Sequence, residues 1–283
     1  MSIARIGKFT IQGELGAGAH STIFLISRHE DGRQYALKVV PIDGPDEKKF
    51  QDQAEHEFRV AQMLDHENLI KIYALEKETN WRFQVRRVNL LIEYVNGQTL
   101  DKLKAISVRK LLPIFVQVAS GLVHMHRRGL FHADMKPNNI ILNRRTGQAK
   151  IIDYGLAWIK GETKGRIQGT PEYMAPETIS SNFINERTDI FNFGATMYRL
   201  ATFRKLPSTV PEADMDIDPV LWSRQVKPVC EINAGAPKEL GELIHRCLEF
   251  DAHKRPETMR EVKFALDKLG EEQSIEQSGP LEW

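Results

Sequence analysis

Three short motifs in a fixed order between His132 and Glu177 constrain this 283-residue chain more than any other feature. They read His-Ala-Asp-Met-Lys-Pro-Asn-Asn from His132, Asp-Tyr-Gly from Asp153, and Ala-Pro-Glu ending at Glu177. Such carboxylate, amide and ammonium groups suit phosphoryl transfer, in which a protein mainly positions the reactants and neutralises charge. The motifs are therefore compatible with a phosphoryl-transfer site.

Each residue type in these motifs has a chemical task in that reaction. Asp134 can accept or orient the proton of the attacking hydroxyl, and Lys136, two residues later, can neutralise the transferring phosphate. Mg²⁺ prefers hard oxygen ligands, which Asn139 and Asp153 would supply. A single Asp or Lys in a loop is more often simply solvated, but three motifs in this order make coincidence a poor explanation.

The motifs resemble the catalytic loop, the metal-binding triplet and the end of the activation segment of protein kinases. The resemblance covers residues 9–269 and is to the eukaryotic-like (Hanks-type) Ser/Thr kinases, of the compact kind common in bacteria. It implies an α+β, two-lobed fold, with a small antiparallel β lobe and one major helix at 9–95 and a larger, mainly helical lobe at 96–269. Residues 270–283 would form a polar, mobile tail.

The resemblance also implies the cofactors, the substrate and one more catalytic residue. ATP, with Mg²⁺ or Mn²⁺, would bind in the cleft between the lobes, and its γ-phosphate would pass to Ser or Thr hydroxyls of protein substrates. Lys136 and the run Gly169–Tyr173 are typical of the Ser/Thr branch. By its position Thr170 should form hydrogen bonds near Asp134 and Lys136.

A glycine-rich stretch opens the nucleotide-binding half of the chain. Residues 9–15 read as a strand that runs into Leu15–Ile23, where glycines would let backbone N–H groups approach phosphates. Alone this pattern is weak, because short glycine turns are common in hairpins. It resembles the phosphate-covering loop of kinases, with Ser21 in place of the third glycine, and it implies phosphate contacts at Gly16 and Gly18.

A β-rich run follows at 34–40, and its period of two places Ala36 and Lys38 on one face. It resembles the kinase strand in which a small alanine leaves room for adenine and a lysine holds phosphate oxygens. Glu57 lies at the edge of an apolar helix stripe, where a carboxylate needs a cationic partner. Its spacing of nineteen residues from Lys38 matches the lysine–glutamate pair of the family.

The other nucleotide contacts also follow from the resemblance. The run Leu91–Gly97 resembles the hinge between kinase lobes, so backbone groups of Glu93 and Val95 are expected to bind adenine. Apolar side chains would enclose the adenine ring: Leu15, Ile23, Ala36 and, as its floor, Ile141.

Three further family positions carry structural or regulatory expectations. Asp189 resembles the buried Asp that braces the catalytic loop, and Arg255 would pair with Glu177. Ala133 replaces the usual Arg before the catalytic Asp (a non-RD kinase), and that Arg normally meets an activation-loop phosphate. Thr163 offers the one hydroxyl between residues 156 and 168, so we expect an activation segment that is competent without phosphorylation.

Composition and charge limit the class of protein and of partner. The chain is 41% hydrophobic and 27% charged, as ordinary globular proteins are. Its net charge of +1 favours neither nucleic acid nor an anionic membrane. No apolar run approaches the roughly twenty residues of a membrane span, and the first residues lack a signal-peptide core. We expect a cytoplasmic protein that acts on proteins, with no nucleic-acid partner; the oligomeric state stays open.

One loop falls outside these assignments. Strands are expected at about 71–77 and 88–95, and the hairpin between them carries Trp81 and three arginines, Arg82, Arg86 and Arg87. It fits either a docking surface or a solvated turn.

Two rival interpretations remain. A pseudokinase would use the fold for nucleotide binding or scaffolding without transfer, and it would be favoured by loss of Lys38, Asp134, Asn139 or Asp153, all of which are present. A small-molecule kinase on a related fold would not need Gly169–Glu177, which in the family forms a peptide platform. The sequence favours a protein kinase over both.

Overall fold

The computed structural model describes residues 5–6, 9–18, 20–43, 46–104, 106–162, 168–181, 183–210 and 218–277. By their internal contacts they form two compact units. The first contains Met1–Asp65, Leu69–Asn96 and Asp153–Gly155, and the second His66–Asn68, Gly97–Ile152 and Leu156–Trp283. The first holds an antiparallel sheet with one long helix and the second is mainly helical, which confirms the expected fold class.

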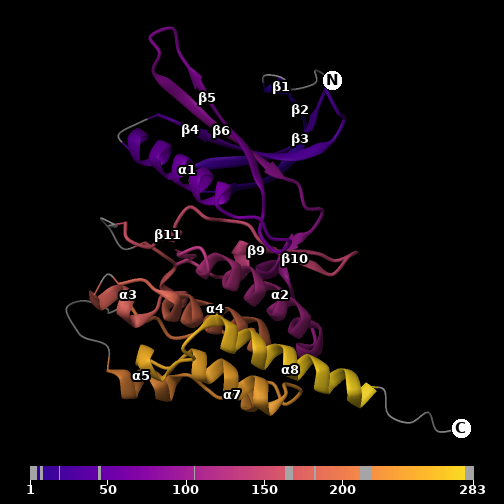
Figure 1. Ribbon diagram of the computed structural model, residues 1–283, viewed down its shortest axis with the longest axis vertical. Coiled ribbons are helices and arrows are strands. Elements are labelled where there is room, and N and C mark those ends of the chain that lie inside the picture. Colours follow the sequence, from indigo (N-terminus) through magenta and orange to yellow (C-terminus); the bar gives the residue numbers. More distant parts are fainter. Residues whose placement is uncertain are drawn as a thin grey trace, which may run out of the picture. The chain divides into compact units, whose positions relative to one another are not determined.

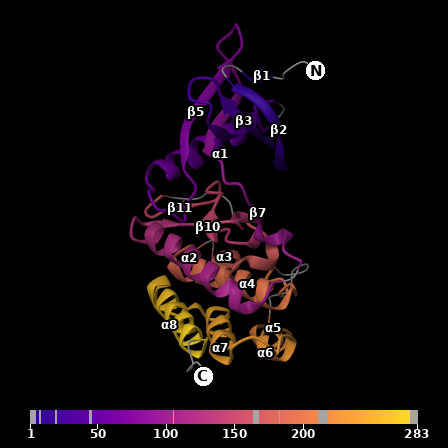
Figure 2. The same cartoon turned by 90° about the vertical axis from the view of Figure 1, so that its right-hand side faces the viewer.

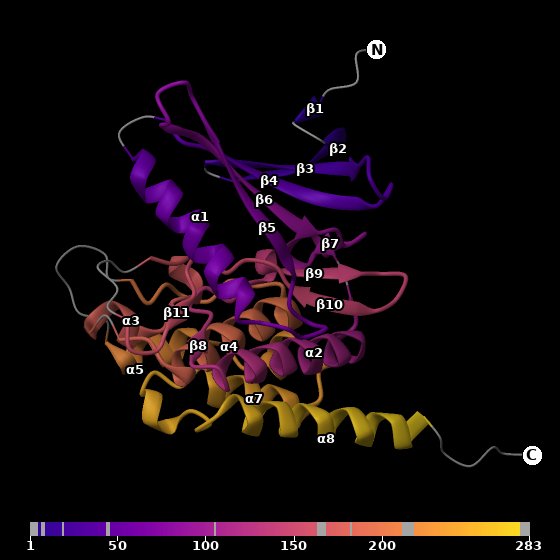
Figure 3. The same ribbon diagram turned by 45° about the horizontal axis from the view of Figure 1, so that its top comes forward.

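The first unit is built on a six-stranded sheet in the order β1-β2-β3-β4-β6-β5, with neighbouring strands antiparallel (Figures 1 and 2). Its strands are β1 (Arg5–Ile6), β2 (Phe9–Gly18), β3 (Ser21–Arg28), β4 (Gln34–Pro41), β5 (Ile72–Thr79) and β6 (Val85–Glu93). Helix α1 (Glu47–Gln62) packs against β4, β5 and β6, and Figure 3 shows it running alongside β5.

Successive side chains of β4 lie on opposite faces of this sheet, and the two faces differ in their surroundings. One face carries a cluster of buried apolar side chains: Phe9, Ile26, Leu37, Val39 and Leu91. Because successive side chains of a strand point to opposite faces, Ala36 and Lys38 lie on the other face. That face meets α1, since Lys38 reaches Glu57 on this helix.

Two parts of the first unit differ from the sequence expectation. The glycine-rich stretch is not a loop beyond a strand at 9–15, because β2 stays paired with β3 as far as Gly18. Register shifts between Ile11 and Gly13 and between Glu14 and Gly16 absorb the irregularity, as β-bulges do. The β5–β6 hairpin is also longer than expected, so that only residues 80–84 remain between its strands.

The second unit packs helices around α4. Its helices are α2 (Val108–His126), α3 (Pro176–Ser181), α4 (Glu186–Thr202), α5 (Pro219–Gln225), α6 (Val229–Ile232), α7 (Lys238–Cys247) and α8 (Met259–Gln277). Short strands form a sheet of β10 (Gln148–Ile151), β9 (Ile140–Asn143) and β7 (Gln98–Thr99) and a pair of β11 (Trp158–Ile159) and β8 (Leu130–Phe131). The 3-10 helices are η1 (Leu100–Lys102), η2 (Pro137–Asn139), η3 (Pro171–Tyr173) and η4 (Ala252–Lys254).

Helix α4 is nearly all buried, and its ends explain its bounds. Asn185 forms a capping box with Thr188 at the start, and Phe203 adopts a left-handed conformation just after the end. Within the helix, a Cβ on Gly194 would lie 2.7 Å from Cβ of Cys247. Glycine therefore allows the close approach of α7, and Cys247 is a buried packing residue with a free thiol.

Helix boundaries in the second unit correct one expectation, at the C-terminal end. Pro113 lies inside α2, and the two short helices α5 and α6 come before α7. Residues 270–277 continue α8 instead of forming a tail, whereas 278–283 and Thr163 lie outside the described residues. Among the described helices, none is long and apolar enough to cross a membrane.

Candidate active site

Asp134, Lys136 and Thr170 form a closed hydrogen-bonded group in the second unit. The Lys136 ammonium donates to Asp134 Oδ2 and to Thr170 Oγ1, both at 2.7 Å. The Thr170 hydroxyl in turn donates to Asp134 Oδ1 at 3.3 Å. Asp134 is only 7% exposed, so its carboxylate is largely shielded from water, and it is fixed by these two partners and by Asn139 Nδ2, which donates to Oδ2 at 3.3 Å. The positions expected from the sequence are thus brought together.

Asn139 has the geometry of a potential metal ligand. Its Nδ2 donates to the main-chain carbonyl of Asp134 at 2.8 Å, which turns its Oδ1 away from that contact. Among the described residues this Oδ1 accepts no hydrogen bond. An amide oxygen in that condition, on a residue that is only 6% exposed, fits a hard cation such as Mg²⁺.

The catalytic loop is held by a carboxylate that comes from α4. Asp189 is fully buried, and its two oxygens accept the N–H groups of His132 at 2.8 Å and of Ala133 at 2.7 Å. Ala133 has φ +64°, which is unfavourable for a residue with a Cβ. These hydrogen bonds compensate the strain, and the bracing expected of Asp189 is confirmed.

His126, which sequence reasoning missed, supports Asp189 from the end of α2. Its Nε2 lies 2.7 Å from Asp189 Oδ2, and its Nδ1 lies 3.1 Å from Glu186 Oε1. Burial lowers the pKa of a histidine, but these two carboxylates outweigh burial and raise the pKa of His126 to about 9. A histidine cation therefore balances the buried charge behind the catalytic loop.

This cation predicts a loss of stability at alkaline pH. The folded pKa of His126 is raised above the unfolded value of about 6.5. Its contribution is therefore complete below pH 6.5 and is lost as the pH rises through about 9. The shift corresponds to on the order of 3 kcal/mol in the free energy of unfolding. Urea denaturation over this pH range should show that decline in the wild type and a flatter profile in His126→Gln. Equal slopes for both proteins would contradict the assignment.

The first unit carries a buried ion pair between β4 and α1. Lys38 Nζ lies 2.6 Å from Glu57 Oε2, and the Glu57 side chain is 2% exposed. Burial lowers the pKa of a lysine, but the carboxylates of Glu57 and Asp153 overcome it and leave the pKa of Lys38 raised. Lys38 is therefore cationic at neutral pH, and the pairing expected from the spacing is observed.

Asp153 and Tyr154 belong to the first unit. Asp153 Oδ1 accepts the N–H of Gly155 at 2.8 Å, and no described residue donates to its Oδ2, which fits a metal ligand. Tyr154 is fully buried, and its hydroxyl donates to the carbonyl of Ile70 at 3.0 Å. The Tyr154 hydroxyl is thus satisfied inside the unit.

The expected nucleotide-binding residues are mostly neighbours on the sheet. The strand register aligns Gly16 with Ile23 and Ile23 with Lys38 in one row across β2, β3 and β4. Directly opposite side chains share a face of an antiparallel pair, so Ile23 and Lys38 point the same way. Leu15 lies next to Gly16 on β2 and is 41% exposed. Gly18 is the last residue of β2.

The remaining expected contacts lie at the ends of other strands. Glu93 ends β6, where its N–H donates to the carbonyl of Lys71 at 2.9 Å and its Oε2 accepts the N–H of Lys71 at 3.2 Å. Val95 makes no hydrogen bond among the described residues, so its N–H is available. Ile141 is half-buried on β9 of the second unit.

A buried arginine fixes the end of the activation segment. The Arg255 side chain is 0% exposed, and it makes a two-pronged pair with Glu177 at 2.8 and 2.9 Å. It also donates to the carbonyls of Arg187, Glu249 and Phe250. The expected pair of Arg255 and Glu177 is confirmed, and it is part of a larger network.

A pocket of about 210 Å³ adjoins the Asp134 group in the second unit. Thr170 and Asn138 line it together with Arg199, whose Nη1 is buried without a hydrogen-bond partner among the described residues. Lys205 and Glu172 on its wall neutralise each other at 2.8 Å. The sequence carries no local signal for this pocket, because its lining comes from segments far apart in the chain.

Comparison with known proteins agrees with this geometry. Residues 9–264 match the protein kinase domain model. A probable serine/threonine-protein kinase of Clostridium acetobutylicum is 28% identical over 93% of this chain and 39% of its own length. Serine/threonine-protein kinase pkn2 of Myxococcus xanthus is 27% identical (94% and 33%), and PrkC of Bacillus subtilis is 24% identical (94% and 42%). The chain thus spans less than half the length of these relatives. It belongs to the protein kinase family.

Proposed function

We propose that this chain transfers the γ-phosphate of ATP to serine or threonine hydroxyls of protein substrates. The closed group of Asp134, Lys136 and Thr170 carries the proposal, because it joins a shielded carboxylate to a fixed cation. The names of the bacterial relatives favour the Ser/Thr class. ATP as the donor places the proposed reaction in the cytoplasm.

In the proposed reaction the acceptor hydroxyl attacks the γ-phosphorus while the bond from phosphorus to the bridging oxygen of ADP breaks. Asp134 orients this hydroxyl and receives its proton, and Lys136 neutralises the transferring group. Thr170 keeps Asp134 and Lys136 in register through its hydroxyl. The pocket beside Thr170 is where we place the acceptor segment.

The other expected site residues would bind ATP and its metal ion. Mg²⁺ would neutralise the phosphates, with oxygens of Asn139 and Asp153 among its ligands. Lys38 would hold phosphate oxygens, and Glu57 would orient Lys38. The other residues proposed to contact the nucleotide are Leu15, Gly16, Gly18, Ile23, Ala36, Glu93, Val95 and Ile141.

Labelled γ-phosphate and a generic basic protein test the proposal. Transfer should require Mg²⁺ or Mn²⁺ and should stop in excess chelator, because the phosphates need a cation. Asp153→Ala should abolish transfer, whereas Asp52→Ala, which alters an exposed carboxylate on α1, should not. A wild type that binds ATP without transfer in Mg²⁺ would instead indicate a pseudokinase.

A further inference from the structure

The tip of the β5–β6 hairpin exposes two large aromatic rings. Trp81 is 80% and Phe83 is 89% exposed, the highest fractions of any large hydrophobic side chain among the described residues. Exposed apolar groups that gather in one place indicate an interaction site more often than scattered ones do. Figures 1 and 3 show the hairpin projecting beyond the neighbouring strands of its own unit.

The tip is an ordered turn that presents these rings outward. Asn80 Oδ1 accepts the N–H groups of Arg82 at 2.9 Å and Gln84 at 3.0 Å, and Asn80 Nδ2 donates to Gln84 Oε1 at 2.9 Å. The N–H of Phe83 donates to the carbonyl of Asn80 at 3.0 Å. Phe83 is held at φ +60°, a conformation that a bulky residue rarely adopts. These hydrogen bonds hold the turn in a shape that leaves both rings in solvent.

Positive charge is concentrated at the same place. Residues 79–92 contain three arginines and no Asp or Glu, although the whole chain has a net charge of only +1. Arg82 and Arg86 are exposed, and the Arg82 guanidinium lies 4.4 Å from the centre of the Trp81 ring. Arg87 is partly neutralised, since its Nη1 lies 3.8 Å from Glu78 Oε1.

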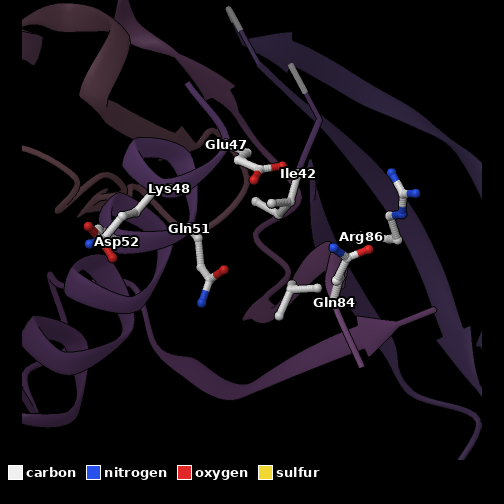
Figure 4. A pocket seen from close by; sticks show the side chains of 8 residues that line it. Ile42, Glu47, Lys48, Gln51, Asp52, Gln84 and Arg86 are labelled. Atoms are coloured by element: carbon white, nitrogen blue, oxygen red, sulfur yellow. The ribbon is translucent and has the colours of Figure 1, made fainter. Parts of the chain in front are cut away.

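A pocket beside the hairpin turn does not share this charge. It measures about 500 Å³, and Gln84 and Arg86 line it opposite residues of α1 (Figure 4). Glu47 and Asp52 on its walls match Lys48 and Arg86 in number, so the pocket itself does not select an anion, but Arg86 forms no ion pair among the described residues.

We propose that the hairpin tip inserts Trp81 and Phe83 into the interfacial layer of an anionic membrane. Trp is favoured at membrane interfaces, and arginines close to the surface are attracted by anionic headgroups. Two rings bury at most roughly 150–250 Å² each, well below the about 800 Å² per partner of a stable protein interface. A membrane needs no complementary surface of that size. Binding then depends on apolar insertion and charge together, and it is reversible.

Sedimentation with vesicles tests the proposal. Wild type should bind phosphatidylcholine–phosphatidylglycerol vesicles, bind phosphatidylcholine vesicles much less, and lose binding as salt is raised. The double variant Trp81→Ser, Phe83→Ser should lower binding roughly tenfold or more. The pair Arg82→Gln, Arg86→Gln should remove the preference for anionic vesicles. Phe264→Ser is the matched control, because Phe264 is 72% exposed on α8 and lies outside the hairpin; it should bind as wild type does.

A second measurement does not depend on how the double variant folds. Brominated phosphatidylcholine mixed with phosphatidylglycerol should quench the fluorescence of the wild type and quench that of Trp81→Phe far less. Three results would overturn the proposal. They are equal quenching of the wild type and Trp81→Phe, equal binding of the wild type to neutral and anionic vesicles, and unchanged binding by the double Ser variant. A lipid-free dimer that the double variant loses would overturn it too, because a second copy of the chain would then be the occupant. Transfer to a soluble substrate should be the same in all hairpin variants, so a failure here leaves the proposed function intact.

Discussion

Lys38→Met is expected to lower phosphoryl transfer by about a hundredfold to a thousandfold, the usual cost of removing one group that stabilises charge in a transition state. Lys38 is held 2.6 Å from the buried Glu57 carboxylate and stays cationic, so the substitution removes a fixed positive charge. Methionine is close to lysine in length and leaves the strand intact. Initial rates at saturating ATP measure the effect.

Lys77→Met supplies the matched control. Lys77 on β5 also pairs with a glutamate of α1, Glu55, at 2.8 Å, but both side chains are about 40% exposed. Loss of that exposed pair should leave the rate within about twofold, because such pairs contribute only about 0–1 kcal/mol. Equal losses in the two variants would show that Lys38 acts through the stability of the first unit and not through the phosphates.

Arg255→Met is expected to lower the free energy of unfolding by about 3–5 kcal/mol, the cost of breaking a buried ion pair. The Arg255 side chain is fully buried, and its loss would remove the guanidinium that donates to three main-chain carbonyls and to both oxygens of Glu177, which would keep the Thr188 hydroxyl as a donor to Oε1. Urea denaturation followed by circular dichroism measures this. Transfer activity should fall as well, since Glu177 ends the activation segment.

Arg246→Met is the control for that experiment. Arg246 pairs with Glu261 at 2.6 Å, but the two side chains are 55% and 43% exposed. This variant should lose about 0–1 kcal/mol at most. A loss in Arg255→Met no larger than in Arg246→Met would mean that the buried network does not hold the segment.

The sequence predicted the features that depend on fixed spacing. Each of three expected contacts is tied to a motif and is present in the structure. They are the pair of Lys38 and Glu57, the pair of Arg255 and Glu177, and the hydrogen bonds from the catalytic loop to Asp189. The catalytic, nucleotide and metal roles remain predictions, because geometry alone does not report turnover or binding.

The features that the sequence did not predict depend on contacts between distant segments. His126 lies 63 residues from Asp189, and a histidine at a helix end gives no local sign of a carboxylate partner. Glycines suggested a loop before Ile23, but pairing with β3 keeps Gly16 in a bulged strand, since tertiary context overrides local propensity. Residues 270–277 read as polar tail and are nevertheless helical.

The most direct test of the central claim compares Asp134→Asn with the wild type on one protein substrate and identifies the phosphorylated residues. We predict phosphoserine or phosphothreonine with the wild type and a rate lower by roughly 10²–10⁴ with the variant, because the amide cannot take the proton of the acceptor hydroxyl. ATP binding, measured by calorimetry, should be retained by both proteins. Transfer by Asp134→Asn at the wild-type rate would contradict the account. So would a wild type that binds ATP and Mg²⁺ but transfers no phosphate.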